Sequence, residues 1–267
     1  MVELTQINIY PVKSCKGTTL TRAGLTAFGL EYDRHWMVVD ADGTFLSQRA
    51  IPRMALIEPS LTNDGLVLKA PNCETIELPR VTTTESPRTV KIWNDVCTAQ
   101  DCGDLAAGWF TQFLGINARL VTLGGAYHRS VNAKYSTNQD QVGFADAFPL
   151  LLISSASLRE LNDRLDSPIP MNRFRPNLVI SGCDPYAEDR WVRFSAGGLT
   201  FKVSKPCARC TVPTVDQTTG TKGKEPSVTL STYRKINNDV YFGQNVINEQ
   251  KSGELVLGME VTILEVA

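Results

Sequence analysis

The stretch HWMVVDADGTFLS, residues 35–47, sets the expectation for the fold. It opens with apolar residues that end in two valines, and Asp42-Gly43 follows, a pair that favours a tight hairpin turn. The residues after this turn return as a second short strand. The same turn pair recurs at Asp64-Gly65. Several short strands joined by such turns predict a β-barrel or a β-sandwich.

The remaining patterns add a few helices and more strands. Leucine and aromatic side chains share one face of 104–114, and Gly115 follows, so this segment is predicted to be a helix that ends at the glycine. Ser157 and Glu160 have the spacing of a capping box, which predicts a second helix over 158–165. Further strands are expected at 7–12, 55–57, 66–68, 90–93, 148–153, 178–180 and 199–203, and a strand pair at 255–264. Buried positions are expected for Trp93, Trp109 and Trp191.

Composition argues against several functional classes. The 267 residues include 27 Lys+Arg and 28 Asp+Glu, and a formal net charge of -1 gives no general attraction to nucleic acid or to anionic membranes. No apolar run approaches the ~20 residues of a membrane helix, and the first residues lack a signal-peptide pattern. Seven cysteines in a chain of this length predict mostly reduced thiols in a cytoplasmic protein. We therefore expect neither nucleic acid nor a membrane as partner.

The single C-x-x-C of the chain runs from Cys207 to Cys210, with Arg209 directly before the second cysteine. A guanidinium beside a thiol favours the thiolate. Four interpretations stay open: a zinc site shared with Cys97 and Cys102, a thioredoxin-like redox motif, two structural cysteines, or one reactive or metal-ligating thiolate. The residues that follow look extended, whereas a redox motif should open a helix. The fourth interpretation makes the best use of the arginine.

Basic side chains lie where strands are predicted to begin or end. Lys13 follows a strand, Arg34 opens another, and Arg175 precedes a proline, which disfavours helix at that position. Taken singly, each is more often an ordinary surface charge, but together they could bind a phosphate. Asp146 lies among apolar residues, so it is a candidate proton donor or water organiser, or a structural carboxylate.

Taken together, these motifs resemble the MOSC-domain proteins, and more closely the mitochondrial amidoxime-reducing component and its bacterial relatives. The motifs occur in that family's order and span nearly the whole chain. They are YPVKSCKG at 10–17, Asp33-Arg34, FRPN at 174–177, SGCD at 181–184, Cys207-x-Arg209-Cys210, Thr214-Val215-Asp216 and FGQN at 242–245.

The resemblance implies a mainly β fold of the α+β class: an N-terminal β-barrel domain over 1–122 and a C-terminal MOSC β-barrel over 123–267, joined near the polar stretch 122–141. It also implies a molybdenum cofactor, a phosphate-bearing molybdopterin whose dithiolene holds molybdenum, and no pyridoxal phosphate. Cys210 would ligate the metal, with Cys207 as a neighbour that does not. The family's cofactor-contacting positions correspond to Lys13, Ser14, Arg34, Ser154, Arg175, Asn177, Arg209, Gln244 and Asn245.

The resemblance further implies an oxidoreductase that reduces N-hydroxylated compounds such as amidoximes, hydroxylamines and N-hydroxylated bases, with Cys210 and Asp146 as its catalytic residues. Because no cysteine cluster follows Cys210, electrons are expected from a separate iron–sulfur or cytochrome b5-like protein. Two other hypotheses remain. The protein could be a cofactor carrier or a sulfur-transfer protein that uses a Cys210 persulfide, or a β-barrel binding domain without metal.

Overall fold

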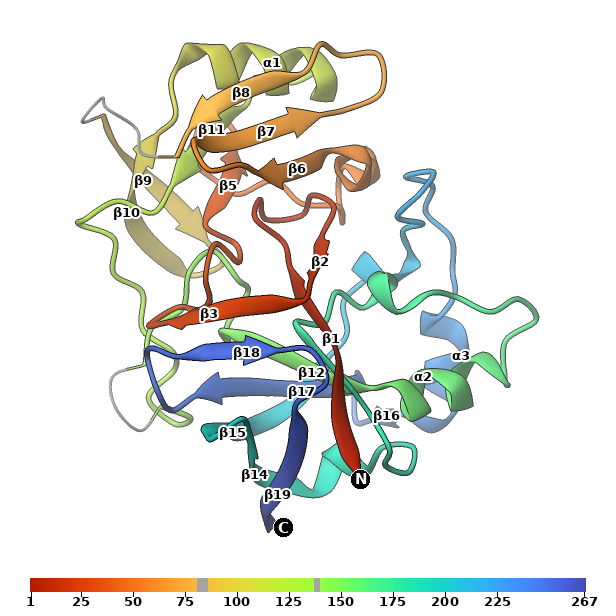
Figure 1. The fold of residues 1–267 in the computed structure, drawn as a ribbon. Coiled ribbons are helices and arrows are strands. Elements are labelled where there is room, and N and C mark those ends of the chain that lie inside the picture. The colour runs from red at the N-terminus through yellow and green to blue at the C-terminus, as the bar shows by residue number, and fades with distance from the viewer. Residues whose placement is uncertain (81–85, 137–139) are drawn as a thin grey trace.

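A closed barrel of seven strands forms the larger part of the molecule (Figure 1). The computed structural model describes residues 1–80, 86–136 and 140–267. The barrel strands are β1 (Val2–Ile9), β12 (Leu150–Ser154), β13 (Leu178–Ser181), β14 (Trp191–Ala196), β15 (Leu199–Ala208), β17 (Asp239–Asn248) and β19 (Glu260–Val266). Their order around the barrel is β12-β13-β1-β19-β14-β15-β17, and β17 pairs with β12 to close it. The first strand of the chain is therefore built into a barrel whose other strands all come from its second half.

Most residues between β5 and β11 form a second group of sheets, at the top of Figure 1. A four-stranded sheet has the order β5-β11-β10-β9, and a three-stranded sheet has the order β6-β7-β8. These elements are β5 (Trp36–Val39), β6 (Glu58–Leu61), β7 (Gly65–Lys69), β8 (Ile76–Pro79), β9 (Pro87–Ile92), β10 (Asp95–Asp101), α1 (Asp104–Leu114) and β11 (Arg119–Thr122). Helix α1 packs on this group through its aromatic side chains.

Short elements surround and connect the two groups. Strand β18 pairs with β3, which in turn pairs with β4. This is the second pairing between the two ends of the chain, because β19 also pairs with β1. The short strands are β2 (Thr18–Leu20), β3 (Arg22–Thr26), β4 (Gly29–Leu30), β16 (Lys235–Ile236) and β18 (Glu254–Val256). The helices are α2 (Ser155–Asn162) and α3 (Ser227–Tyr233), with 3-10 helices η1 (Pro52–Leu56), η2 (Met171–Arg173), η3 (Ala187–Arg190) and η4 (Val212–Thr214).

The prediction of a mainly β fold built on barrels is confirmed. The domain division at residue 122 stays a prediction, and part of the expected junction, residues 137–139, lies outside the described residues. Within the described parts of the chain, no helix combines the length and the apolar character needed to cross a bilayer.

The two predicted hairpin turns form, but the strands beside them differ from the expectation. At Asp42-Gly43 the Gly43 amide donates to the Asp40 carbonyl, and the return arm makes only isolated bridges instead of a strand. Asp64-Gly65 joins β6 to β7. The strand expected at 55–57 is wrong, because Pro52 begins the 3-10 helix η1 and β6 starts only afterwards.

Helix α1 has the predicted bounds, and Gly115 ends it in the left-handed conformation. The capping box predicted for the second helix is wrong, since Ser154 is the N-cap and its hydroxyl accepts from the Ser157 amide. One tryptophan prediction is also wrong. Trp109 and Trp191 are buried, but Trp93 is 54% exposed because it lies in the turn between β9 and β10.

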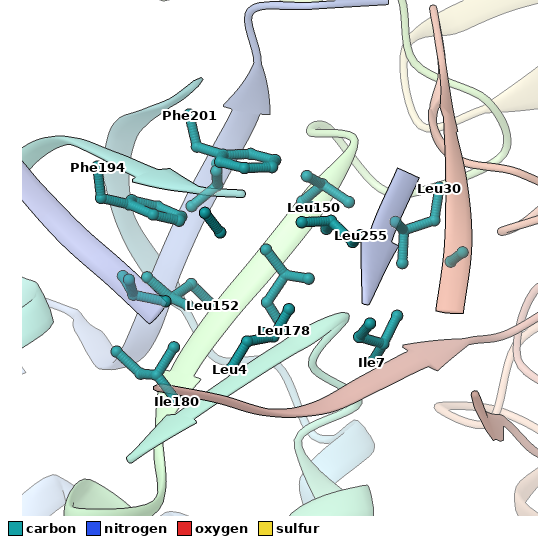
Figure 2. Packing of buried hydrophobic residues seen from close by; sticks show 14 of the residues in the cluster. Leu4, Ile7, Leu30, Leu150, Leu152, Leu178, Ile180, Phe194, Phe201 and Leu255 are labelled. Atoms are coloured by element: carbon teal, nitrogen blue, oxygen red, sulfur yellow. The ribbon is translucent and has the colours of Figure 1, made fainter. Parts of the chain in front are cut away.

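All seven barrel strands contribute side chains to the hydrophobic cluster inside the barrel. Figure 2 shows leucines and isoleucines of β1, β12 and β13 pointing toward Phe194 of β14 and Phe201 of β15. The two phenylalanine rings stack at 5.0 Å with an interplanar angle of 14°. This packing is the main source of stability for the wall that carries the C-x-x-C strand.

Replacing Phe201 with alanine should lower the free energy of unfolding by about 3–5 kcal/mol, because it removes a fully buried ring and leaves a cavity. Urea unfolding followed by circular dichroism measures the change. The exposed Ile236 provides the control, since its replacement by alanine should change stability by less than ~0.5 kcal/mol. Equal unfolding midpoints for the two variants would show that the ring pair does not hold the barrel together.

Candidate functional site

A pocket opens where the end of β15 meets loops from both groups of sheets. Its hollow holds about 800 Å³ of open space when its solvent-exposed mouth is included. Its lining residues come from seven separate parts of the chain. They are Lys13, Ser14, Arg34, Arg49, residues 145–148, Leu150, Leu151, Phe174, Arg175, Asn177, residues 207–210, Val212 and Asn245.

The C-x-x-C lies where β15 loses its regular pairing. The register between β15 and β17 shifts twice, the second time between Pro206 and Ala208, and such irregularities redirect side chains near active sites. Cys207 and Cys210 both reach the pocket wall and are half-buried free thiols. The Cys210 sulfur also accepts a hydrogen bond from the Val212 amide at 3.5 Å.

Each of the two thiols has its own arginine neighbour, and the neighbour of Cys210 is not the predicted Arg209. Arg209 donates to the Cys207 sulfur at 3.1 Å and to the Phe174 carbonyl at 2.8 Å, so its guanidinium serves Cys207. Arg49 is the guanidinium beside Cys210: although burial opposes it, Asp146 and the Cys210 thiol together raise the pKa of Arg49. The predicted partner of Cys210 is therefore replaced by a residue from the other half of the chain.

Asp146 links two cations at the pocket mouth. Its carboxylate accepts from the Lys13 ammonium and from the Arg49 guanidinium, each at 2.6 Å, and its side chain is 50% exposed. Burial alone would raise the pKa of Asp146, but the two cations hold it well below its usual range. At neutral pH this carboxylate is ionised, so it carries no proton to donate, and the geometry favours the role of organiser.

Three of the eight non-glycine residues with positive φ in the described parts of the chain lie on the pocket wall. Ser14, Arg34 and Arg175 all have positive φ, at 67°, 45° and 58°. Non-glycine residues rarely adopt this conformation, and it is found most often at ligand-binding and active sites. Three such residues on one wall, from three separate segments, single out this pocket as the candidate functional site.

Tyr10 arranges two of these arginines. The guanidinium groups of Arg175 and Arg34 lie 4.1 Å and 4.3 Å from the centre of its buried ring. Arg175 donates to the Cys15 carbonyl at 2.6 Å, while Arg34 donates to the Asn177 side chain at 2.9 Å. The stacking fixes the planes of both guanidinium groups, so their remaining N–H groups can serve an anionic ligand in the pocket.

Nine of the eleven predicted site residues line this pocket: Lys13, Ser14, Arg34, Asp146, Arg175, Asn177, Arg209, Cys210 and Asn245. Ser154 and Gln244 are outside its lining. The Ser154 hydroxyl is occupied as the cap of α2, and the Gln244 amide donates to Asp189 at 2.6 Å. Both side chains are buried and engaged on the far side of their strands, so the structure does not bring them to the pocket.

The sequence-based reasoning missed Arg49 and the aromatic wall residue Phe148. No local pattern marks Arg49, which reaches the site only through the fold. The zinc alternative is not supported, because Cys97 packs in the core of the four-stranded sheet and Cys102 in the core under α1. In the described parts of the chain, no three potential His, Cys, Asp or Glu ligands cluster together.

Comparison with known proteins identifies the family of the chain. The MOSC N-terminal beta barrel domain matches residues 1–117 and the MOSC domain matches residues 139–262. The chain belongs to the MOSC family. This MOSC protein is 38% identical to mitochondrial amidoxime-reducing component 1 of Mus musculus, over 86% of this chain and 71% of the relative. It is 35% identical to mitochondrial amidoxime reducing component 2 of Bos taurus, over 86% and 72%. A function related to the molybdenum cofactor follows from this membership.

The pocket of this MOSC protein fits an anionic cofactor with a soft metal. Its described wall carries five cationic side chains and one carboxylate, so it has an excess of positive charge. The Nε atoms of Arg49 and Arg209 are buried and have no hydrogen-bond partner among the described residues. Unsatisfied donors beside two thiols are what a phosphate-bearing, sulfur-bound metal group would require.

Proposed function

We propose that this protein is a molybdenum-cofactor-dependent oxidoreductase that reduces N-hydroxylated compounds with electrons from a separate donor protein. The observation that carries the proposal is the pocket itself, which joins the Cys210 thiol to cations from both halves of the chain. The names of the relatives support the reaction class. Each turnover consumes two electrons and two protons, breaks the N–O bond, and releases the reduced nitrogen compound and water.

In this proposal the pocket residues have three separate roles: ligation of the metal, neutralisation of the phosphate, and orientation of water or substrate. Cys210 ligates the metal, and the bound cofactor supplies the redox chemistry. Lys13, Arg34 and Arg175 neutralise the cofactor's phosphate, and each is held in place by a hydrogen bond to another part of the protein. Asp146, fixed between two cations, orients water or the polar end of the substrate at the mouth.

The test is reduction of an aryl amidoxime by protein made in a host that synthesises the cofactor, with a reduced viologen dye as electron source. We expect one equivalent of molybdenum and steady formation of the amidine. Protein that contains the cofactor but reduces no N-hydroxylated compound with any donor would contradict the proposal and favour a carrier or sulfur-transfer role. A cytoplasmic location and an iron–sulfur or cytochrome b5-like donor are part of the same proposal.

Anion binding by this pocket should weaken above pH 8. Burial lowers the pKa of Lys13 to about 8, although Asp146 opposes the shift, so its ammonium loses its proton well before an ordinary lysine would. Calorimetric titration with sulfate, whose charge is constant in this range, should show affinity falling by up to about tenfold per pH unit above that value. Lys13→Arg should abolish this decline, and an identical decline in that variant would show that another group is responsible.

A further inference from the structure

Arg49 occupies a central place in the pocket although it comes from the N-terminal group of sheets. Its guanidinium donates to Asp146 at 2.6 Å, and Arg49 lies beside Cys210 in the lining of the same pocket. Its side chain is 21% exposed, and its Nε is buried without a partner among the described residues. The planar guanidinium of Arg49 thus donates to the Asp146 carboxylate and also lies beside the Cys210 sulfur.

An exposed tryptophan holds this guanidinium from the outside. The Arg49 guanidinium lies 4.6 Å from the centre of the Trp93 ring, and Phe45 packs edge-on against the same indole at 5.1 Å. Trp93 has φ of 55° in the β9–β10 turn, a conformation that is unfavourable for a bulky residue. Strained residues usually persist where they serve a functional contact. The contact that Trp93 makes is its stacking on the guanidinium of Arg49.

The backbone that carries Arg49 is fixed as well. The preceding residue, Gln48, is fully buried and exchanges two amide hydrogen bonds with Gln217, at 3.1 Å and 2.9 Å. Lys222 donates to the Arg49 carbonyl at 3.2 Å. Both partners come from the loop after the C-x-x-C, so the segment around Arg49 is tied directly to the part of the chain that carries Cys210.

We infer that Arg49 is a positioning residue that holds the Cys210 sulfur and the Asp146 carboxylate in one fixed arrangement. The Trp93 ring stacks on the guanidinium of Arg49 and fixes its orientation. The inference rests on the proposed function, in which Cys210 ligates molybdenum. Hydrogen bonds to a ligating sulfur tune the metal, and outer residues that orient ligands usually change activity by 10–100-fold. Arg209 is engaged with Cys207 and cannot serve Cys210 in the same way.

A lysine at this position would keep the charge but lose the geometry. A guanidinium can stack on an aromatic ring and donate in two directions at once, whereas an ammonium is a point charge on a flexible stem. Arg49→Lys should therefore retain part of the function, and Arg49→Gln should lose nearly all of what Arg49 contributes. Trp93→Ala leaves the pocket wall intact and should reproduce the same defect in weaker form.

The experiment compares these three variants as cofactor-loaded proteins, with Arg53→Gln as the matched control. Arg53 lies on the same segment, but its guanidinium stacks on Phe113 at 4.3 Å and does not line the pocket. For Arg49→Gln we expect kcat to fall about 10–100-fold with KM nearly unchanged, and the electron paramagnetic resonance spectrum of bound molybdenum to shift. Arg49→Lys should be intermediate, Trp93→Ala should lose a few-fold in kcat, and Arg53→Gln should match wild type in both readouts.

The spectrum separates positioning from simple loss of structure, since molybdenum content and folded fraction are measured on the same samples. Wild-type kcat and spectrum in Arg49→Gln would overturn the inference. If Arg49→Gln fails to fold, unaltered kcat and spectrum in both Arg49→Lys and Trp93→Ala would overturn it equally. Wild-type protein that binds no molybdenum would instead overturn the proposed function and the inference with it.

Discussion

Cys210→Ser should lose N-reduction by more than about 100-fold, a larger effect than is typical of residues that only support a metal ligand. The Cys210 thiol lies on the pocket wall beside Arg49, and a serine hydroxyl is too hard a donor for a sulfur-bound redox metal. The cations on the wall should still retain the anionic cofactor. The assay is therefore the rate of amidine formation per bound molybdenum.

Cys207→Ser is the matched control for this prediction. Cys207 lies on the same wall, but its sulfur accepts from Arg209 and it packs against the neighbouring core cluster. We expect a loss of only a few-fold, through the altered position of Arg209. Equal losses in the two variants, or none in either, would mean that Cys210 is not the ligand.

Arg175→Lys should weaken retention of the cofactor by about 10–100-fold, which corresponds to losing one hydrogen bond to a charged group at about 1.5–3 kcal/mol. Arg175 is buried, stacks on Tyr10 at 4.1 Å, and adopts a left-handed conformation that directs it into the pocket. A lysine keeps the charge, but its ammonium group cannot stack on the Tyr10 ring and donate two parallel hydrogen bonds as a guanidinium can. Molybdenum and pterin remaining after gel filtration measure the change.

Arg173→Lys tests whether this loss is specific. Arg173 lies two residues earlier and is also buried, but it donates to the Pro213 and Glu225 carbonyls and lies outside the pocket lining. It should lower the melting temperature without releasing cofactor from the folded protein. Retention in Arg175→Lys equal to that of wild type would show that the phosphate is bound elsewhere.

Much of the site could be predicted from sequence because its residues lie in short local patterns. The C-x-x-C, the arginine before a proline and the lysine after a strand are each visible without coordinates, and all of them line the pocket. Turn chemistry was equally visible at Asp42-Gly43 and Gly115, where a tight turn or a left-handed residue is required.

The failures have two physical causes: Arg49 depends on contacts distant in sequence, whereas Trp93 and Ser154 depend on local turn and helix-cap geometry. Arg49 reaches Cys210 only because the Gln48–Gln217 pair joins two loops that lie far apart in the chain. Trp93 looks like a core residue in a strand pattern, but the turn places it outside. The family resemblance predicts a cofactor contact at Ser154, whereas its hydroxyl caps the first turn of α2.

X-ray absorption at the molybdenum edge tests the central claim most directly, because it counts the sulfur atoms bound to the metal. The account predicts that loaded wild-type protein has one more sulfur neighbour than loaded Cys210→Ser, while Cys207→Ser has the wild-type number. The same sulfur count in wild type and Cys210→Ser would contradict it.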